Sequence, residues 1–311
     1  MTEFHHVSVL LDECLEGLNI KPDGIYVDGT LGGAGHSSQI AARLTTGRLI
    51  GIDRDPVALK AAGERLAPFG DRVTLVHSNF CEIAQVLKDL NIEGVDGILL
   101  DLGVSSPQLD DGSRGFSYMA DAPLDMRMNS EDTMSAYDVV NTWSFEELKR
   151  ILYDYGEERY APRIASAICS RRETKPIETT LELVDVIRGA MPAAALREKQ
   201  HPAKRSFQAI RIAVNDELGS VEKVMKDAIP CLNPGGRLAV ITFHSLEDRI
   251  VKNAMADAAK GCTCPPSFPV CVCGKKPLVQ LVTRKPIVSG DEELERNPRA
   301  RSAKLRVCEK K

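Results

Sequence analysis

Three aspartates each follow a short apolar run in the first third of the chain: Asp28, Asp53 and Asp101. A glycine-rich stretch, residues 29–35, comes directly after the first of them and precedes an Ala- and Leu-containing segment of helical character. A glycine-rich turn between a strand and a helix lets backbone amides approach a ligand closely, so the pattern is typical of a nucleotide-type site. In open α/β sheets the reacting groups collect at the carboxyl ends of the strands, where these carboxylates are expected.

The composition of the glycine loop narrows the choice of ligand. A dinucleotide loop reads G-x-G-x-x-G, but counting from Gly33 the last position is Ser38, and the Gly-Lys-Ser/Thr of a P-loop is absent. A carboxylate at Asp28 would repel phosphate. S-adenosylmethionine has no phosphate, and its ammonium and sulfonium groups are cationic. The loop therefore favours S-adenosylmethionine as the cofactor.

Two further residues stand where such a cofactor needs contacts. Asp53, at the end of the second apolar run, is placed to accept hydrogen bonds from both ribose hydroxyls. Phe80 follows the third run, where an aromatic ring can pack on adenine. Each residue alone also has an ordinary structural explanation, as a turn glycine, a helix cap or a core Phe. Their order along successive strand ends makes the combination specific.

The elements that must position these residues alternate between strand and helix. Apolar runs at 25–28, 49–53, 72–76 and 95–101 alternate with helical segments near 36–45, 56–67 and 80–90. Strands that are nearly continuous in apolar residues predict a parallel sheet covered on both faces. The fold class expected is α/β, a Rossmann-like S-adenosylmethionine-dependent methyltransferase sheet.

After about residue 110 only helical patterns follow, until a strand is expected again at 237–243. We therefore predict an inserted all-helical domain between the fourth and fifth strands, with domain boundaries 1–112, 113–200 and 201–311. One long helix is expected over 206–229, and further strands over 278–283 and 304–308.

Composition limits the class of protein. With 311 residues, 43% hydrophobic, 27% charged and a net charge of −4, the chain is typical of globular proteins and excludes fibrous or mostly disordered ones. Without an apolar run of about 18–20 residues or the features of a signal peptide at its start, we expect a cytoplasmic protein with no membrane partner. Residues 275–311 carry eleven Lys or Arg against five Asp or Glu. Such a basic segment is typical either of a site that binds a polyanion or of a solvated tail.

Four of the nine cysteines lie close together, at Cys262, Cys264, Cys271 and Cys273. Four thiolates can complete a tetrahedral zinc shell, but C-x-C pairs are less usual than C-x₂-C, and free thiols on a surface hairpin explain them too. From spacing alone we assign no metal. The Pro230-Cys231 pair resembles the nucleophile of carbon-5 methyltransferases, yet it precedes the fifth strand, which favours a structural Cys.

Longer motifs follow the fourth strand, beginning with Asp101-Leu102-Gly103-Val104-Ser105-Ser106-Pro107-Gln108. With them the chain resembles, over nearly its whole length, the RsmH (MraW) family of 16S ribosomal RNA cytosine-N4 methyltransferases. The matching stretches are 6–11, 28–37, 53–56, 101–110, 115–117, 123–128, 155–159, 201–203, 207–211, 243–249 and 297–302. The 262–273 segment departs from the family pattern.

The resemblance implies a methyl-donor site and a target cytidine in the decoding region of the small ribosomal subunit, with 16S rRNA in that subunit or its precursor as the partner. The cofactor residues that it implies are Ala34, Gly35, His36, Asp53, Phe80, Asp101 and Gln108. The alternatives are a non-catalytic RNA-binding assembly factor and a methyltransferase acting on a protein or small molecule.

The chemistry requires a hydrogen-bond acceptor for the cytosine amine, whose lone pair is conjugated into the ring. Asp101 is the first candidate, although it can instead hold the cofactor; Ser105 and nearby backbone carbonyls are the alternatives. Phe116 or Tyr118 is a candidate to stack on the base, unless both pack in a core. His244 is a candidate for substrate contact next to a helix start that we expect Ser245 to cap.

The basic residues predicted to bind phosphates beside the target come from two segments. Solvated charge, with ion pairs to Glu292, Glu293 and Glu295, is the other explanation. The candidates are Lys204, Arg205, Arg299, Arg301, Lys304 and Arg306.

Overall fold

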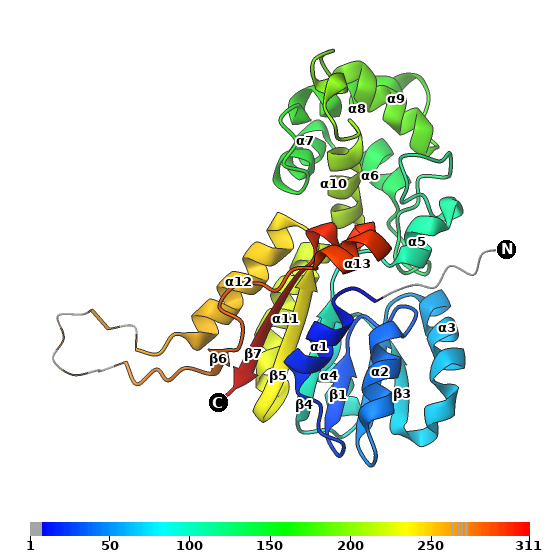
Figure 1. The fold of residues 1–311 in the computed structure, drawn as a ribbon. Coiled ribbons are helices and arrows are strands. Elements are labelled where there is room, and N and C mark those ends of the chain that lie inside the picture. The colour runs from blue at the N-terminus through cyan, green and yellow to red at the C-terminus, as the bar shows by residue number, and fades with distance from the viewer. Residues whose placement is uncertain (1–7, 263, 266–267, 269, 271–272) are drawn as a thin grey trace. The chain divides into compact units, whose positions relative to one another are not determined.

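The computed structural model describes residues 8–262, 264–265, 268, 270 and 273–311. Contacts divide the chain into two compact units (Figure 1). Residues up to Gly103 and from Leu218 onwards form one, here called the sheet unit, and Val104–Glu217 form the other, the helical unit. Among the described residues, no helix is long and apolar enough to cross a membrane.

The sheet unit is built on one seven-stranded sheet in the order β3-β2-β1-β4-β5-β7-β6. The first five strands run parallel, and β7 lies antiparallel between β5 and β6. The strands are β1 (Ile25–Asp28), β2 (Arg48–Asp53), β3 (Val73–His77), β4 (Val95–Asp101), β5 (Leu232–Thr242), β6 (Val279–Leu281) and β7 (Lys304–Lys310).

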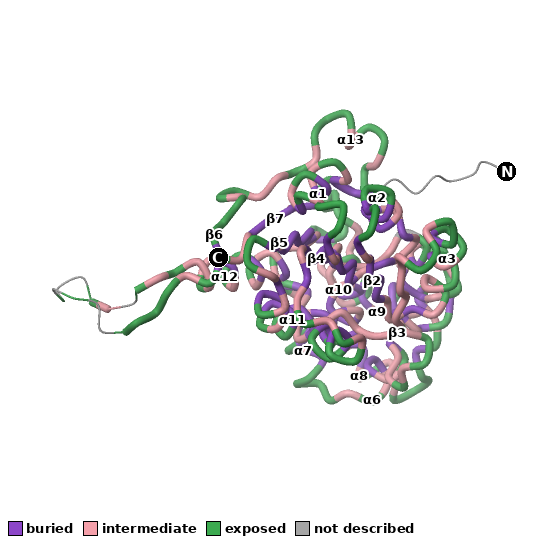
Figure 2. The backbone as a smooth tube through the Cα atoms, turned by 90° about the horizontal axis from the view of Figure 1, so that it is seen from below, coloured by how far each residue is buried: buried purple, intermediate pink, exposed green. Residues whose placement is uncertain are grey.

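Helices cover both faces of this sheet, as the continuous apolar character of its strands requires. The buried side chains form one apolar cluster on each face, and Figure 2 shows the strands as mostly buried backbone. One cluster includes α1 (Leu11–Leu18), α2 (Gly35–Arg43) and α3 (Pro56–Leu66), and the other includes α4 (Ile83–Asp89), α11 (Glu217–Cys231) and α12 (Ser245–Ala259). Shorter elements are η1 (Ala67–Arg72), η2 (Phe80–Glu82), α13 (Asp291–Arg296) and η5 (Pro298–Ser302).

The helical unit packs around a single apolar cluster. Four of its helices begin with a capping box, in which Ser105, Ser135, Ser144 and Thr179 exchange hydrogen bonds with the third helical residue. Its elements are α5 (Ser106–Asp110), η3 (Gly112–Arg114), α6 (Ala136–Thr142), α7 (Phe145–Asp154), α8 (Ala161–Thr174), α9 (Thr180–Ala190), η4 (Ala195–Arg197) and α10 (Lys204–Asn215).

Two features differ from the sequence predictions. The single helix expected over 206–229 is wrong, because the chain breaks between α10 and α11 at Asp216, whose φ of 45° is left-handed. The inserted helical part spans 104–217 rather than 113–200. It is longer at its carboxyl end because Phe207 and Ile210 of α10 belong to the helical core.

Candidate cofactor and active site

The glycine loop joins β1 to α2 with two residues in the left-handed conformation, which glycine adopts freely but which strains any residue with a Cβ, including Ala34. Gly32 has a φ of 49° and Ala34, directly before α2, a φ of 58°. A Cβ on Gly35 would collide with the hydroxyl of Ser8, so the first turn of α2 needs glycine to pack against that segment. Ala34, the residue before α2, provides no side-chain cap for the backbone amides of the first helical turn.

Asp28 braces this loop from within. Its side chain is buried, Oδ1 accepts from the amide of Thr30 at 3.1 Å, and Oδ2 accepts from the hydroxyl of Ser37 at 2.7 Å. Burial raises the pKa of this carboxyl group. The sequence argument used Asp28 to exclude phosphate; the structure shows that it also ties β1 to the first turn of α2.

Asp53 connects the end of β2 to the same loop. Its Oδ2 accepts from the amide of Gly32 at 2.7 Å, and its Oδ1 accepts from the amide of Asp55 at 2.8 Å. Each carboxylate oxygen has room for a second donor. Burial raises the pKa of Asp53 to about 6, with the charges of Asp55 and Asp28 acting in the same direction and the two amides against it.

Asp101 ends β4 with one oxygen unsatisfied. Its backbone amide donates to the Thr30 hydroxyl at 2.6 Å, but its buried Oδ1 has no hydrogen-bond partner within the described residues. Oδ2 lies 3.8 Å from Nδ1 of His36, whose Nε2 is 2.9 Å from the carbonyl oxygen of Val9. A buried acceptor without a donor is costly, which points to a donor supplied by a ligand.

The three carboxylates share one electrostatic environment. Burial raises the pKa of Asp101 to about 6; the His36 side chain opposes this shift, and the charge of Asp28 reinforces it. The charge of Asp28 raises the pKa of Asp53 as well. Such a concentration of negative charge suits a cationic ligand, as the sequence predicts for the cofactor.

Phe80 lies beside the glycine loop in the sheet unit. A Cβ on Gly29 would sit 3.1 Å from the Phe80 Cβ and 2.6 Å from Cδ2 of Leu100. The Phe80 ring is partly buried against the apolar cluster that contains α4. Its place next to the loop fits the adenine contact expected from the sequence and serves packing as well.

Ser105 and Gln108 belong to the helical unit, where they cap α5 for each other. The Ser105 hydroxyl accepts from the amide of Gln108 at 3.4 Å, and Oε1 of Gln108 accepts from the amide of Ser105 at 3.1 Å. This capping box gives both residues a structural role that the sequence analysis missed. The signal was available, because Ser-x-x-Gln with Pro107 in the first turn is a helix-start pattern.

The two aromatic candidates in the helical unit differ in environment. Phe116 is only 6% exposed and belongs to the helical core, which favours the packing explanation over base stacking. Tyr118 is partly buried and stacks on His201, with ring centroids 4.5 Å apart and an interplanar angle of 15°. Its edge contacts Phe207 at 5.8 Å. Tyr118 stays the aromatic candidate for the substrate, with His201 as a neighbour that the prediction did not include.

His244 caps α12, so the prediction that Ser245 is the cap is wrong by one residue. Nδ1 of His244 accepts from the amide of Glu247 at 3.5 Å, and Nε2 lies 3.1 Å from Oε1 of the same residue. The Glu247 carboxylate in turn accepts from the amide of Phe243 at 3.0 Å. An imidazole nitrogen thus replaces the hydroxyl oxygen that usually occupies this position.

The basic residues of the tail divide into two groups. Arg299 and Arg301, in η5, are exposed. Arg306 is 8% exposed and its Nε donates to Asp248 at 2.7 Å, and Lys304 lies 3.4 Å from the same carboxylate. The hypothesis that Arg306 grips phosphate is therefore wrong: its guanidinium neutralises Asp248 on α12. Of the two candidates in the helical unit, Arg205 donates to the carbonyl of Glu157 at 2.7 Å.

The fold and this site together define a class. A mostly parallel sheet with one antiparallel strand near its edge, a glycine loop without P-loop residues, and carboxylates at the ends of β1, β2 and β4 are the features of S-adenosylmethionine-dependent methyltransferases. The unsatisfied oxygen of Asp101 and the charge around it fit a cationic methyl donor.

Comparison with known proteins places the chain within that class. Residues 3–311 match the MraW methylase family, to which the chain belongs. It is 62% identical over 308 residues to the ribosomal RNA small subunit methyltransferase H of Brevibacillus brevis, covering 99% of this chain and 98% of that protein. It is 59% identical to the same-named protein of Heliobacterium modesticaldum, covering 99% of each chain. The chain also aligns with the solved structure of an rRNA methylase from Streptococcus thermophilus. That alignment covers 98% of each chain, with a TM-score of 0.44 and 10% sequence identity.

Proposed function

We propose that this methyltransferase transfers a methyl group from S-adenosylmethionine to the exocyclic N4 amine of a cytidine in the decoding region of 16S rRNA, within the small ribosomal subunit or its precursor. Family membership and the names of relatives near 60% identity support the class of substrate. The observation that carries the chemistry is the buried, unsatisfied Oδ1 of Asp101 at the end of β4.

The residues that would hold the cofactor belong to three strand ends and the loop between the first strand and its helix. Asp53 would accept from the ribose hydroxyls while keeping its two backbone donors, because a carboxylate has about four acceptor sites. The amides at the start of α2 suit the cofactor's carboxylate. When bound, the cofactor supplies an electrophilic methyl group on a positively charged sulfur.

The chain must make a weakly nucleophilic amine reactive. Holding the amine near attack distance accounts for much of such catalysis. An acceptor for one amine N–H turns the nitrogen lone pair out of conjugation and takes up the proton as positive charge develops. With a pKa of about 6, Asp101 is a carboxylate at neutral pH and meets both requirements.

Asp101 also remains a candidate to bind the cofactor's ammonium group. Substitution by Asn distinguishes the two roles. If Asp101 accepts from the cytidine, methyl transfer falls by the factor of about 100 or more that a lost general base costs, while cofactor affinity changes little. If it holds the cofactor, the affinity falls together with the rate.

The experiment measures transfer of labelled methyl groups to small ribosomal subunits from cells that lack this gene. Nuclease digestion followed by mass spectrometry identifies the modified nucleoside. The expected product is N4-methylated cytidine, present with wild type and absent with the Asp101→Asn variant. Label that resists nuclease would indicate a protein substrate, and RNA binding without label would indicate a non-catalytic assembly factor.

A further inference from the structure

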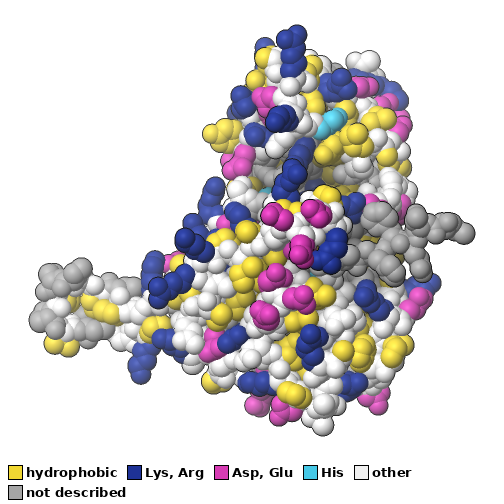
Figure 3. Space-filling view, in the orientation of Figure 1, with side chains coloured by type: hydrophobic (Ala, Val, Ile, Leu, Met, Phe, Trp, Pro, Cys, Tyr) yellow, Lys and Arg dark blue, Asp and Glu magenta, His cyan; other side chains and the backbone are white. Residues whose placement is uncertain are grey.

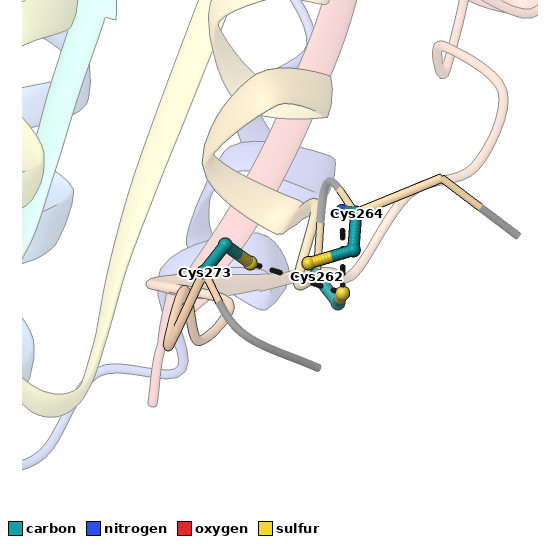
Figure 4. A group of neighbouring side chains, drawn as sticks. All are labelled: Cys262, Cys264 and Cys273. Carbon is teal, nitrogen blue, oxygen red and sulfur yellow. Dashed lines mark hydrogen bonds between the residues drawn. The ribbon is translucent and has the colours of Figure 1, made fainter. Parts of the chain in front are cut away.

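Three cysteines that the methyl-transfer site does not use converge outside it. Cys262, Cys264 and Cys273 lie in the segment between α12 and β6, and their sulfur atoms all lie within 4.8 Å of one another (Figure 4). Cys271, the fourth cysteine of the sequence pattern, lies outside the described residues.

The spacing of the sulfurs matches metal coordination. Zinc–thiolate bonds of about 2.3 Å in a tetrahedron place neighbouring sulfurs about 3.8 Å apart. The sulfurs of Cys262 and Cys273 are 3.8 Å apart. Cys264 is within the same 4.8 Å limit, so the three sulfurs are close enough together for a single ion to bind all of them.

Backbone geometry around the thiols supports thiolates at this place. The amide of Cys264 donates to the sulfur of Cys262 at 3.4 Å, a contact that favours the charged form. Gly274, directly after Cys273, has a φ of 63°, which turns the chain at a position where other residues are strained. Lys260, Lys275 and Lys276 are exposed at the two ends of the segment, and Figure 3 shows basic side chains where it joins the sheet unit.

The described residues of this segment are not held by apolar packing. None of the described residues in 260–278 is buried, and Phe268 and Val270 are 50% and 70% exposed. The base is closed, because the amide of Leu278 donates to the carbonyl of Ala258 at 2.8 Å. A long connection whose described residues contribute nothing to an apolar core requires another source of order, and small elements of this kind commonly use a metal.

We propose that Cys262, Cys264 and Cys273 form a structural zinc site that orders the excursion between α12 and β6. The three thiolates supply three ligands, and one further donor completes the tetrahedron. The cluster provides no acid, base or nucleophile for the methyl-transfer reaction. Zinc binding here is independent of the proposed methylation.

The test uses the full-length protein, purified in reducing buffer without chelator. Elemental analysis is expected to find a single zinc ion per chain. Replacement by Co²⁺ should give the thiolate charge-transfer band and the intense visible bands of a tetrahedral site. The double variant Cys262→Ser/Cys273→Ser is expected to lose both the zinc and the cobalt bands, and its thermal unfolding should stay cooperative because neither side chain belongs to the core.

The matched control is Cys169→Ser in α8, which removes one thiol outside the cluster and should retain the zinc. Limited trypsin digestion provides a second measurement: cleavage after Lys260 and Lys275, which are both exposed, should accelerate in the double variant and in chelated wild type. Wild-type protein without zinc, zinc retained in the double variant, or a disulfide joining Cys262 and Cys273 would each overturn the proposal.

Discussion

Replacing Asp53 tests the proposed contact between its carboxylate and the ribose hydroxyls of the cofactor. In the structure this carboxylate accepts hydrogen bonds from the amides of Gly32 and Asp55. With the cofactor bound, it would also accept hydrogen bonds from the two ribose hydroxyls. Asp53→Ala removes all of these acceptors, whereas Asp53→Asn keeps one oxygen but loses the charge. Asp53→Asn therefore keeps part of the hydrogen bonding that holds the loop, whereas Asp53→Ala removes all of it.

The magnitude follows from the strength of hydrogen bonds to charged groups, roughly 1.5–3 kcal/mol. We expect the dissociation constant for S-adenosylmethionine to rise roughly 10–100-fold in Asp53→Ala, since 1.4 kcal/mol corresponds to a factor of about ten. Asp53→Asn should lie between Asp53→Ala and wild type, because its remaining oxygen can still accept from one donor.

The dependence on pH gives the prediction a second, independent signature. The free Asp53 carboxyl has a pKa of about 6 and must be ionised to accept from both hydroxyls. Cofactor binding therefore lowers this pKa, and affinity falls as the pH drops through 6. At pH 5 about nine-tenths of the groups are protonated, so this residue weakens wild-type binding about tenfold relative to neutral pH. Asp53→Asn lacks that contribution.

Isothermal titration calorimetry at pH 5 and pH 7.5 measures both effects. Asp96→Asn is the matched control, because Asp96 also binds a backbone amide, that of Ile25 at 3.0 Å, but lies at the amino end of β4. Its variant should lose stability without losing cofactor affinity. Unchanged affinity in a folded Asp53→Ala protein would refute the assignment of Asp53 to the ribose.

Three further predictions concern activity, RNA binding and stability. The kcat/KM of methyl transfer, which reports the free protein, should fall at least about tenfold per pH unit below 6 as Asp101 takes up a proton, and a value that stays constant to pH 5 would exclude it as the acceptor. Arg299→Ala and Arg301→Ala should each make the salt dependence of RNA affinity shallower by about one unit of slope, without altering cofactor affinity; an unchanged slope in both would remove the tail from the RNA site. Gly115→Ala should lower the free energy of unfolding of the helical unit by roughly 2–4 kcal/mol in urea, because φ is 72° and the new Cβ would strike the carbonyl of Pro123. Gly189→Ala, in open space within α9, should instead raise the free energy of unfolding by about 0.5–1 kcal/mol. Equal stabilities of the two variants would contradict the packing described.

The positions of the strands could be predicted because strands of a parallel sheet are buried on both faces, and this burial appears in the sequence as nearly continuous apolar runs. The runs 25–28 and 95–101 coincide with β1 and β4, and the parallel sheet with a helical insertion after the fourth strand is confirmed. Periodicity could not reveal the break at Asp216, because apolar residues recur at helical spacing through both α10 and α11 while a left-handed backbone residue ends the first helix.

The site residues were predictable only as far as their chemistry is local. Carboxylates at strand ends follow from the pattern alone. Partners distant in sequence do not: Asp248 neutralises Arg306 across 58 positions, and Thr30 holds the backbone of Asp101 across 71. Phe116 shows the same limit, since an aromatic residue in a loop gives no sign of whether a core will enclose it.

The place of the helical unit in the chain determines the order in which the protein can fold during synthesis. β4 ends at Asp101, but its neighbour in the sheet, paired at Ile241, is made 140 residues later. At roughly 5–20 residues per second, the ribosome needs about 7–28 s to cover that distance. The helical unit, Val104–Glu217, is synthesised entirely within that interval.

Closure of the sheet then depends on a strand that is translated later still. β7 pairs with β5 but follows it in sequence, with Lys304 coming 62 positions after its partner Thr242, so β5 keeps an open hydrogen-bonding edge until Lys304–Lys310 are made. A chain without β7 would retain that bare edge, which is a template for intermolecular strand pairing.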